Sequence, residues 1–454
     1  MKYISTRGQA PTVDFAQAML SGLAPDGGLY LPETWPAADP ELARTGVPYA
    51  SVARSVLTTF AGTSLPAGTL DAAVARLVDR FRHQAVTPLV QLDAGLWLLE
   101  LFHGPTAAFK DLAMQLAASL MDAALAGTGD RLTLVTATSG DTGAAAVRAF
   151  AGADRIRLIV LHPEGRVSPV QRLQMTTVAA DNVTNLAVRG DFDDCQRLVK
   201  GLLADESLRA LGPLSSVNSI NWARLAGQIP YYVTAGAALA GAAPRFVVPT
   251  GNFGDAFAGW AARRMGANVG GLLAAVNSND ALARVLAEGV YSRRTTIETH
   301  SVSMDVQAPS NFERLVFEAT DRDADRTRTV FETFARDGTV TLDDDLLSRL
   351  RAEVSAETVS EAETRTEIAH AWSAYGQIIC PHTAVALVAA RRQDLSAGPV
   401  VALATAHPAK FPDVVSGALG LEPRRPSVLE GLEGRPEYCR AVEPTLAAVR
   451  AALN

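Results

Sequence analysis

Short apolar runs alternate with small polar turns and helical patterns through the middle of the chain. Residues 132–136 (LTLVT) form one such run, the turn 138–143 (TSGDTG) follows it, and a helical pattern begins at Ala144. The same kind of run returns at residues 156–161, 185–189, 245–249, 271–276 and 399–405. Runs of this length that alternate with helices are typical of parallel strands buried on both faces. The pattern predicts an α/β fold with doubly wound parallel sheets covered by helices.

The length of the chain and changes in this pattern predict three parts. The chain has 454 residues, which is long for one hydrophobic core. Residues 1–90 combine turn signals with helical spacing, so we expect a mostly helical N-terminal segment. Residues 91–225 are expected to form a smaller α/β domain, and residues 226–454 a larger one. Within the larger domain, the acidic region 321–367 predicts amphipathic helices on an outer face.

Composition and charge narrow the classes of function. The net charge is −7, so a nucleic acid or an anionic membrane is not the expected partner. Hydrophobic residues make up 48% of the chain, which is ordinary for a soluble enzyme. The three cysteines are isolated, and the histidines do not form a metal-binding set. The N-terminus lacks the apolar core of a signal peptide. We therefore expect a soluble cytoplasmic protein that binds a small molecule and no metal, with its oligomeric state open between monomer and homodimer.

Lys110 lies in the stretch 100–115 (ELFHGPTAAFKDLAMQ) and is one of only four lysines, whereas most of the 41 basic residues are arginines. A lysine amine can lose its proton and attack a carbonyl group, which a guanidinium cannot do. The Gly-Pro-Thr before it predicts that Lys110 begins a helix, where the helix dipole and apolar neighbours would lower its pKa. A solvated lysine paired locally with Asp111 is the alternative.

The turn 250–255 (TGNFGD) joins a predicted strand to a predicted helix. Glycines at 251 and 254 let the backbone approach a ligand, and the free N–H groups at the start of a helix favour an anion such as phosphate. The spacing matches neither the dinucleotide-binding fingerprint nor the P-loop. An unoccupied tight turn is the alternative for this motif taken alone.

The turn 138–143 is a second strand-to-helix junction, and its amides with the hydroxyls of Ser139 and Thr142 could bind a carboxylate. In doubly wound sheets such turns gather at the carboxyl ends of the strands, where ligands bind. Lys110, both turns and Thr405 all lie at such junctions. An amine, a carboxylate site and a phosphate site together match pyridoxal phosphate (PLP).

Segments along the whole chain resemble the threonine synthase family. They include HGPTAAFKD, TATSGDTG, VSPVQRLQM, SVNSINWARLAGQIPYY, VPTGNFGD, SMDVQAPSNFER, CPHTAVA and ATAHPAKF. The resemblance implies a fold-type-II PLP enzyme, of the longer form of the family. It also implies the conversion of O-phospho-L-homoserine and water to L-threonine and phosphate, by γ-elimination and β-addition, as the last step of threonine biosynthesis.

The resemblance also implies roles for individual residues. Lys110 would form the Schiff base with PLP, and Thr405 would contact the pyridine nitrogen. The phosphate of PLP would be held by Gly251, Asn252, Phe253, Gly254 and Asp255. Asp141 stands where related folds place Asn beside the phenolic oxygen of PLP, and an ionised carboxylate there would be unfavourable. The candidates for binding the substrate are Ser5, Arg7, Ser139, Thr142, Asn218, Ser219, Asn221, Arg224 and Lys410.

Two other functions stay open at this point. A different fold-type-II lyase, such as a threonine dehydratase or a sulfhydrylase, would need one phosphate site instead of two. A non-catalytic relative would keep the fold as a binding module and would not form the coloured product of a lysine with PLP.

Overall fold

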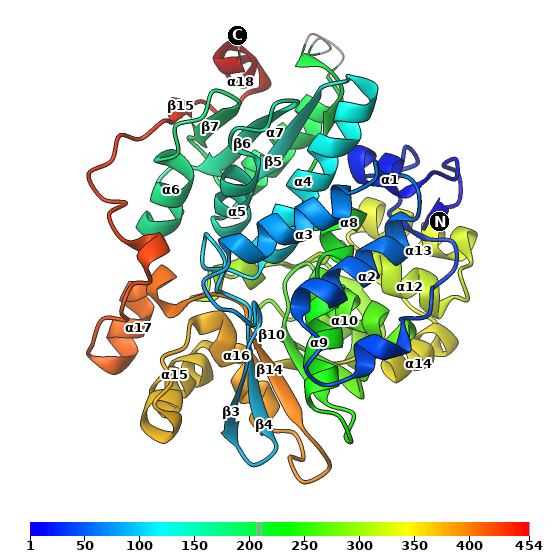
Figure 1. The fold of residues 1–454 in the computed structure, drawn as a ribbon, viewed down its shortest axis with the longest axis vertical. Helices are drawn as coiled ribbons and strands as arrows, with labels where there is room; N and C mark the ends of the chain where they lie inside the picture. The colour runs from blue at the N-terminus through cyan, green and yellow to red at the C-terminus, as the bar shows by residue number, and fades with distance from the viewer. Residues whose placement is uncertain (206–207, 209–210, 454) are drawn as a thin grey trace.

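Two sheets of mostly parallel strands lie at opposite ends of the long axis of the molecule (Figure 1). The computed structural model describes residues 1–205, 208 and 211–453. The larger sheet has six strands, and its neighbouring pairs are parallel except for the antiparallel pair β3–β4. Its spatial order is β13 (Ser355–Thr358), β10 (Gly271–Val276), β9 (Arg245–Pro249), β14 (Val400–Ala404), β4 (Leu96–Glu100) and β3 (Leu89–Asp93).

The second sheet has five strands, and all of its neighbouring pairs are parallel. Its order is β15 (Arg440–Val442), β7 (Val183–Val188), β6 (Ile156–Pro163), β5 (Leu132–Ala137) and β8 (Leu214–Ser215). Helices α5 (Asp141–Phe150), α6 (Pro169–Thr176) and α7 (Phe192–Leu203) connect its strands. Helix α7 begins after Asp191, which caps it and forms a capping box with Asp194.

Each sheet contributes side chains to a core on both of its faces. In β9, Phe246 and Val248 lie in one core with Phe257 of helix α10 (Gly254–Arg264). Between them, Val247 points to the other face and packs in a second core with Val385 of helix α16 (Pro381–Arg391). This alternation follows from the two-residue period of a strand. It explains why the parallel strands are apolar throughout, and the predicted α/β class is confirmed.

The N-terminal segment is mostly helical and adds one short antiparallel pair. It contains β1 (Tyr3–Ser5), α1 (Phe15–Ser21), β2 (Tyr30–Pro32), α2 (Tyr49–Ala61) and α3 (Thr69–Arg80). The acidic region 321–367 contains α13 (Ala324–Asp337), α14 (Asp344–Glu353) and the first half of α15 (Glu361–Tyr375), and α12 (Phe312–Ala319) directly precedes it. Strands β11 (Val290–Ser292) and β12 (Thr339–Thr341) pair with each other outside the two main sheets.

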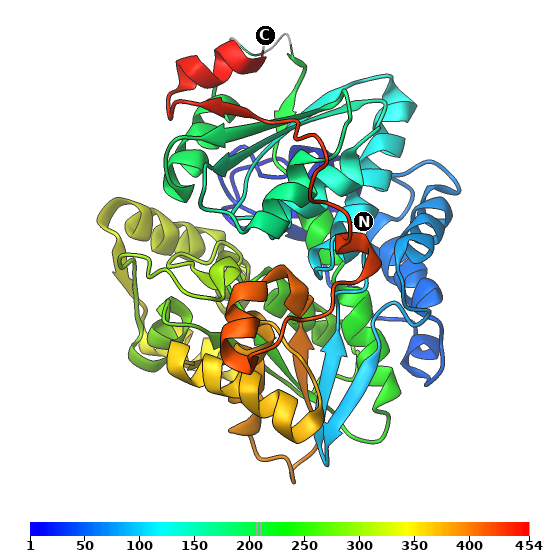
Figure 2. The same ribbon diagram turned by 90° about the vertical axis from the view of Figure 1, so that its left-hand side faces the viewer.

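At two places, strands predicted to lie in one domain belong to the sheet of the other domain. Strands β3 and β4 belong to the six-stranded sheet, although all of β4 and residues 91–93 of β3 lie in the range predicted for the smaller domain. At the other end of the chain, the segment after α17 (Pro412–Leu419) returns to the five-stranded sheet as β15 and helix α18 (Leu446–Leu453) (Figure 2). The domain boundaries themselves stay a prediction. Among the described residues, no helix is both long enough and apolar enough to cross a membrane.

Candidate active site

Lys110 is the first residue of helix α4 (Lys110–Thr128), and a loop of residues 101–109 leads into it from β4. This loop runs beside the end of β14. The N–H of Phe109 donates to the carbonyl of Thr405 at 2.8 Å, and Ala108 forms an isolated bridge with Ala406. Lys110 and Thr405 are therefore brought to one place although they lie far apart in the sequence.

The side chain of Lys110 points to Asp141 and not to its sequence neighbour Asp111. Its amine lies 3.4 Å from Oδ2 of Asp141, and its side chain is only 12% exposed. Asp111 instead accepts hydrogen bonds from the N–H (2.8 Å) and the hydroxyl (2.7 Å) of Thr106. Burial lowers the pKa of Lys110, although the negative charge of Asp141 opposes this effect. The alternative of a solvated lysine paired with Asp111 is wrong.

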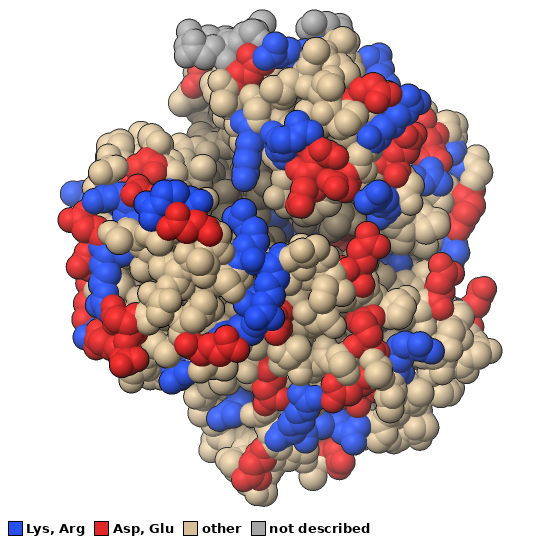
Figure 3. Space-filling view, turned by 180° about the vertical axis from the view of Figure 1, so that it is seen from behind, with Lys and Arg blue, Asp and Glu red and all other residues tan. Residues whose placement is uncertain are grey.

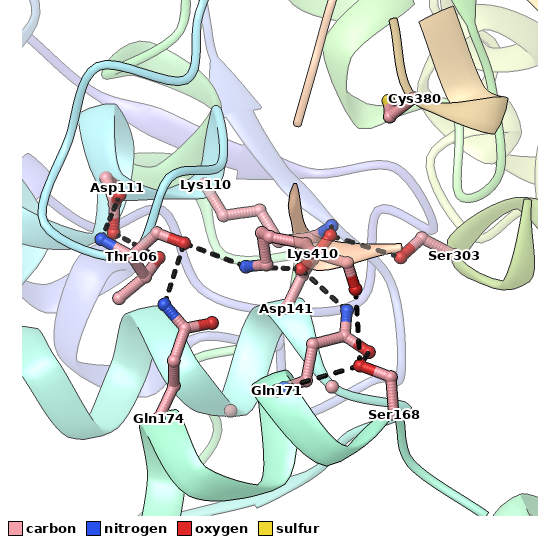
Figure 4. Close-up of polar contacts among 12 residues, drawn as sticks. Thr106, Lys110, Asp111, Asp141, Ser168, Gln171, Gln174, Ser303, Cys380 and Lys410 are labelled. Atoms are coloured by element: carbon pink, nitrogen blue, oxygen red, sulfur yellow. Dashed lines mark hydrogen bonds and ion pairs between the residues drawn. The ribbon is translucent and has the colours of Figure 1, made fainter. Parts of the chain in front are cut away.

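Asp141 is the first residue of α5 and lies between two lysines (Figure 4). Its Oδ1 is 2.7 Å from the amine of Lys410 and accepts from Nε2 of Gln171 at 2.8 Å. Its Oδ2 faces Lys110 and accepts from the hydroxyl of Ser303 at 3.4 Å. Although burial opposes ionisation, the two lysines hold the pKa of Asp141 well below its usual range. A charged carboxylate at this position is therefore compensated within the protein.

The turn after β9 has the backbone of an anion site. Gly251 must be glycine, because a Cβ there would lie 2.6 Å from the carbonyl oxygen of Ser303. Phe253 adopts a left-handed backbone with φ of 62°, and helix α10 begins at the next residue, Gly254. The backbone of Asn252 is held by Asn311, whose N–H and side-chain amide both donate to the Asn252 carbonyl at 3.1 Å. The first N–H groups of α10 lack partners within the helix and are directed out of its start.

Asp255 belongs to this turn in sequence, but its carboxylate is directed away from it. Its Oδ1 accepts hydrogen bonds from the hydroxyls of Tyr231 and Tyr232. These tyrosines lie in helix α9 (Ile229–Ala238). Burial raises the pKa of Asp255 to about 6. The backbone of Asp255 can therefore serve an anion, while its side chain packs in the core.

Arg224 is a buried cation near Lys110. It lies in helix α8 (Trp222–Ala226) and is 2% exposed, and its positive charge contributes to the lowered pKa of Lys110. One of its guanidinium nitrogens donates to the carbonyl of Val217 at 3.1 Å, while its Nε is buried without a partner in the described part of the chain. Burial lowers its pKa to about 10. A buried guanidinium with an unsatisfied donor suits an anionic ligand.

Asn218 and Ser219 connect this region with both turns. The side chain of Asn218 accepts from the hydroxyl of Thr136 (2.8 Å), which lies near the end of β5 beside the turn 138–143. The carbonyl of Ser219 accepts from Asn311, and the Cβ of Ser219 would lie 3.8 Å from a Cβ added to Gly254. The space-filling view in Figure 3 shows a hollow in one face of the molecule, with Lys and Arg side chains along its edge. Among the described residues, no cluster of His, Cys, Asp and Glu could hold a metal ion.

Three family models match most of the chain, between residues 2 and 453. The model described as pyridoxal-phosphate dependent enzyme matches residues 81–346. A model of the threonine synthase N terminus matches residues 2–77, and a model of the threonine synthase C-terminal part matches residues 383–453. The threonine synthase of Pseudomonas aeruginosa is 43% identical over 99% of this chain and 97% of its own length.

The chain belongs to the threonine synthase family. A crystal structure of PLP-bound threonine synthase from Brucella melitensis superposes with a TM-score of 0.95 at 48% identity, over 99% of this chain and 98% of that one. Threonine synthase from yeast gives a TM-score of 0.92 at 34% identity, over 100% of this chain and 98% of that one. A threonine deaminase from Solanum lycopersicum is only 13% identical, with a TM-score of 0.52, over 87% of this chain and 92% of that one, so it shows the fold alone. The predicted family, fold type and dependence on PLP are confirmed.

Several of the residues predicted as candidates for substrate binding have partners within the protein. Arg7 forms a two-pronged ion pair with Glu313 of α12, with two N–O distances of 3.0 Å. Ser5 donates to Asp26 at 2.8 Å. Asn221 caps helix α8 through Ala223, and its amide also donates to the carbonyl of Met19, so it does not share a ligand face with Arg224. Lys410 is fully buried against Asp141 and is not free to bind the substrate phosphate.

Ser139 and Thr142 are half-buried beside Asp141 in the turn between β5 and α5. The hydroxyl of Thr138 accepts the N–H groups of Gly140 and Gly143, so two amides of this turn are already used. The hydroxyls of Ser139 and Thr142 stay the candidates for a carboxylate here, which remains a prediction.

Sequence reasoning missed the residues that surround Asp141. Gln171 and Ser303 both contact its carboxylate, and the N–H of Ser303 donates to Nε2 of His382 at 3.2 Å. Burial lowers the pKa of His382 to about 4, so it is neutral at physiological pH. One signal was available for Lys410: it is another of the four lysines in a chain that otherwise uses arginine.

Proposed function

We propose that this chain converts O-phospho-L-homoserine and water to L-threonine and phosphate, with PLP attached to Lys110. The observation that carries the proposal is the buried amine of Lys110, which stands beside two strand-to-helix turns and a buried guanidinium. Because burial lowers the pKa of Lys110, its amine is more readily uncharged than an exposed lysine. An uncharged amine can bind an aldehyde and later accept a proton.

The residues of the site fit PLP. The turn 251–255 offers backbone N–H groups at the start of α10 for the phosphate of PLP, and Gly251 leaves room that a side chain would fill. Thr405, at the end of β14, is the proposed partner of the pyridine nitrogen. When bound, PLP supplies an aldehyde for amines and a ring that withdraws electrons from the α-carbon of the substrate.

Lys110 is the proposed acid and base of the reaction. Once the substrate amine takes its place, the freed amine of Lys110 can carry protons between neighbouring carbon atoms. Asp141 lies within 3.4 Å of this amine and holds it in position. The buried surroundings limit the access of water, which strengthens each of these charge interactions.

A second anion is expected at Arg224, because the substrate carries its own phosphate. The buried and unpartnered Nε of Arg224 supports this role, and Asn218 and Ser219 lie in the segment before it. Ser139 and Thr142 are the proposed ligands of the substrate carboxylate. We further propose a cytoplasmic location, with which the three free cysteines agree.

The proposal is tested by measuring phosphate release and threonine formation from O-phospho-L-homoserine. We expect Lys110→Ala to abolish turnover, and Lys200→Ala, which changes an exposed lysine in α7, to retain it. Conversion of unphosphorylated L-threonine to an oxo acid at comparable efficiency would favour the dehydratase. A colourless protein without turnover would favour a non-catalytic relative. Robust activity of Lys110→Ala would contradict the proposal.

A further inference from the structure

Lys410 is a second lysine in the site, and it is completely buried. It ends a short 3₁₀ helix, η4 (Pro408–Lys410), that follows β14. Its side chain is 0% exposed and its amine lies 2.7 Å from Oδ1 of Asp141. The same amine donates to the carbonyl of Thr106 at 2.8 Å. A lysine buried to this degree requires a fixed anion, and Asp141 is that anion.

Asp141 divides its two oxygens between the two lysines (Figure 4). Oδ1 has the short contacts, with Lys410 and Gln171. Oδ2 has the longer contacts, with Lys110 and Ser303, both at 3.4 Å. Lys410 is therefore the closer counter-ion of Asp141, and Lys110 is the more distant one.

The order of these contacts matters because Lys110 must give up its positive charge to bind an aldehyde. If Lys110 were the sole cation beside Asp141, its loss of charge would leave a buried carboxylate uncompensated, which costs several kcal/mol. The ion pair of Lys410 with Asp141 removes this penalty. While Lys110 is charged, two cations (Lys110 and Lys410) face one anion (Asp141). After Lys110 has lost its charge, Lys410 and Asp141 remain as an ion pair without net charge.

We propose that Lys410 is a positioning residue for the reaction, which acts as the permanent counter-ion of Asp141 and so lets Lys110 become neutral while Asp141 stays ionised. This inference deepens the proposed function and rests on it, because it assigns a task to Lys410 within the same site. It also gives a physical reason for a charged Asp at a position beside the bound coenzyme.

The other charged groups around Lys110 do not replace Lys410. Arg224 is a cation that repels the charged amine of Lys110, so Arg224 lowers the pKa of Lys110, as burial does. His382 is neutral, because its pKa is about 4. Asp255 is bound by two tyrosines, and Asp111 is bound by Thr106 and has its pKa raised by burial. His407 is near Lys410, and burial lowers its pKa to about 4.

Lys410 also holds the loop before Lys110, because its amine donates a hydrogen bond to the carbonyl of Thr106 in that loop. That carbonyl additionally accepts from Nε2 of Gln174 at 3.0 Å. A variant at Lys410 could thus disturb the loop without any effect on charge. The test must therefore read the charge of Lys110 directly and must include a variant that keeps the cation.

The experiment uses full-length protein with ¹³C-labelled lysine side chains, freed of coenzyme, and follows the lysine Cε resonances by NMR against pH. Only four lysines are present, and the resonance of Lys110 is assigned by its absence in Lys110→Ala. In Lys410→Met we expect the pKa of Lys110 to rise by roughly 1 to 3, because Lys110 becomes the sole close cation of Asp141. Lys410→Arg should keep the pKa of Lys110 within about 0.5 of the wild-type value, because the cation remains.

A double variant separates charge from packing. In Lys410→Met/Asp141→Asn the anion is gone as well, so the rise in the pKa of Lys110 should disappear. Asp141→Asn alone should lower the pKa of Lys110, because the negative charge beside its amine is lost. This measurement uses protein in which Lys410 is intact. The control Lys200→Met should leave the pKa of Lys110 unchanged. With coenzyme bound, a pH titration of the visible absorption should shift upwards in Lys410→Met and return in the double variant.

An unchanged or lowered pKa of Lys110 in Lys410→Met would overturn the inference, as would an equal rise in Lys410→Arg. If Lys410→Met fails to fold, a rise of the Lys110 pKa in Asp141→Asn would contradict it equally. Because these readouts need no substrate, a failure of the proposed reaction would show as absent turnover with the pKa pattern intact. If the inference alone is wrong, the wild-type protein would still turn over its substrate, but the pKa of Lys110 would not rise in Lys410→Met.

Discussion

Two turns of the molecule share one local design, since each joins a buried parallel strand to a helix and places a Gly-Asp pair where the helix begins. Asp141 in the turn after β5 and Asp255 in the turn after β9 are both buried. Their charges differ nonetheless. Two lysines hold the pKa of Asp141 well below its usual range, whereas burial beside two tyrosines raises the pKa of Asp255 to about 6.

The difference teaches that distant residues, and not the turn itself, decide what each carboxylate does. Lys410 approaches Asp141 from the end of the six-stranded sheet, and Tyr231 and Tyr232 approach Asp255 from α9. One turn therefore supplies a charged group to the site. The other turn supplies backbone N–H groups and keeps its carboxylate in the core.

The largest expected effect comes from removing the charge of Asp141, and the same substitution at Asp255 is the comparison. We expect Asp141→Asn to lower kcat/KM by about 100-fold, which corresponds to about 2.7 kcal/mol of lost stabilisation of the transition state. Asp255→Asn keeps the backbone of its turn and an acceptor for the tyrosines, so it should change kcat/KM by less than about threefold. Steady-state kinetics on both variants measures the two effects. Equal losses of kcat/KM would contradict the different roles of the two aspartates.

Arg224 sharpens the same comparison, because we propose that it binds the substrate instead of the coenzyme. Loss of a charged hydrogen bond costs about 1.5–3 kcal/mol, so Arg224→Ala should raise KM for O-phospho-L-homoserine by about 10- to 100-fold. The affinity for PLP should hardly change. Arg264→Ala, at an exposed position in α10, is the matched control. A selective loss of PLP binding in Arg224→Ala would refute its assignment to the substrate phosphate.

Gly251 tests whether the turn after β9 works through its backbone. A Cβ at this position would collide with the carbonyl of Ser303, so Gly251→Ala should weaken PLP binding by about tenfold or more, equivalent to about 1.4 kcal/mol. Gly417 lies in helix α17 with open space around it, and Gly417→Ala should leave PLP binding unchanged. Fluorescence titration of both coenzyme-free variants measures the two affinities, and equal affinities would contradict the role of the turn.

The smallest expected effects concern stability and pH, and they have opposite signs for the two aspartates. The pKa of Asp255 is about 6 in the folded protein and about 3.9 in an unfolded chain, so its contribution favours folding at low pH and is lost as pH rises through about 6. Asp141 has a lowered pKa, so its contribution is present above about pH 4 and is lost as pH falls below that value.

Urea unfolding midpoints at about pH 5 and pH 7 separate these contributions. Asp255→Asn should reduce the loss of stability between these two pH values, whereas Asp141→Asn should lower stability at both. An identical pH dependence in wild type and Asp255→Asn would show that the raised pKa of Asp255 has no consequence for folding.

Local patterns were sufficient to predict strands inside both main sheets, which are β5, β6 and β7 in one and β9, β10 and β14 in the other. The run 132–136 and the turn 138–143 became β5 and the start of α5, because a fully apolar strand and a Gly-rich turn are encoded by adjacent residues. Sheet membership was not predictable in this way. Residues 89–100 and 440–442 join the sheets expected to be formed by other parts of the chain, since pairing of parallel strands depends on distant segments.

The candidate site shows the same limit. Lys110 was found from its rarity and its place at a helix start, which are features of the sequence. The partner of Arg7 is Glu313 and the partner of Asp141 is Lys410, and both pairs join residues far apart in the chain. Charge alone therefore suggested Arg7 and Lys410 as ligands of the substrate phosphate, although tertiary contacts engage both of them.

The most direct test of the account is to identify the lysine that carries the coenzyme. Borohydride reduction of the purified, PLP-loaded protein, followed by peptide mapping, reads this out among four lysines. We predict that the pyridoxyl group is found on the peptide that contains Lys110. Modification of Lys410 instead, or a protein that takes up no coenzyme, would contradict the account.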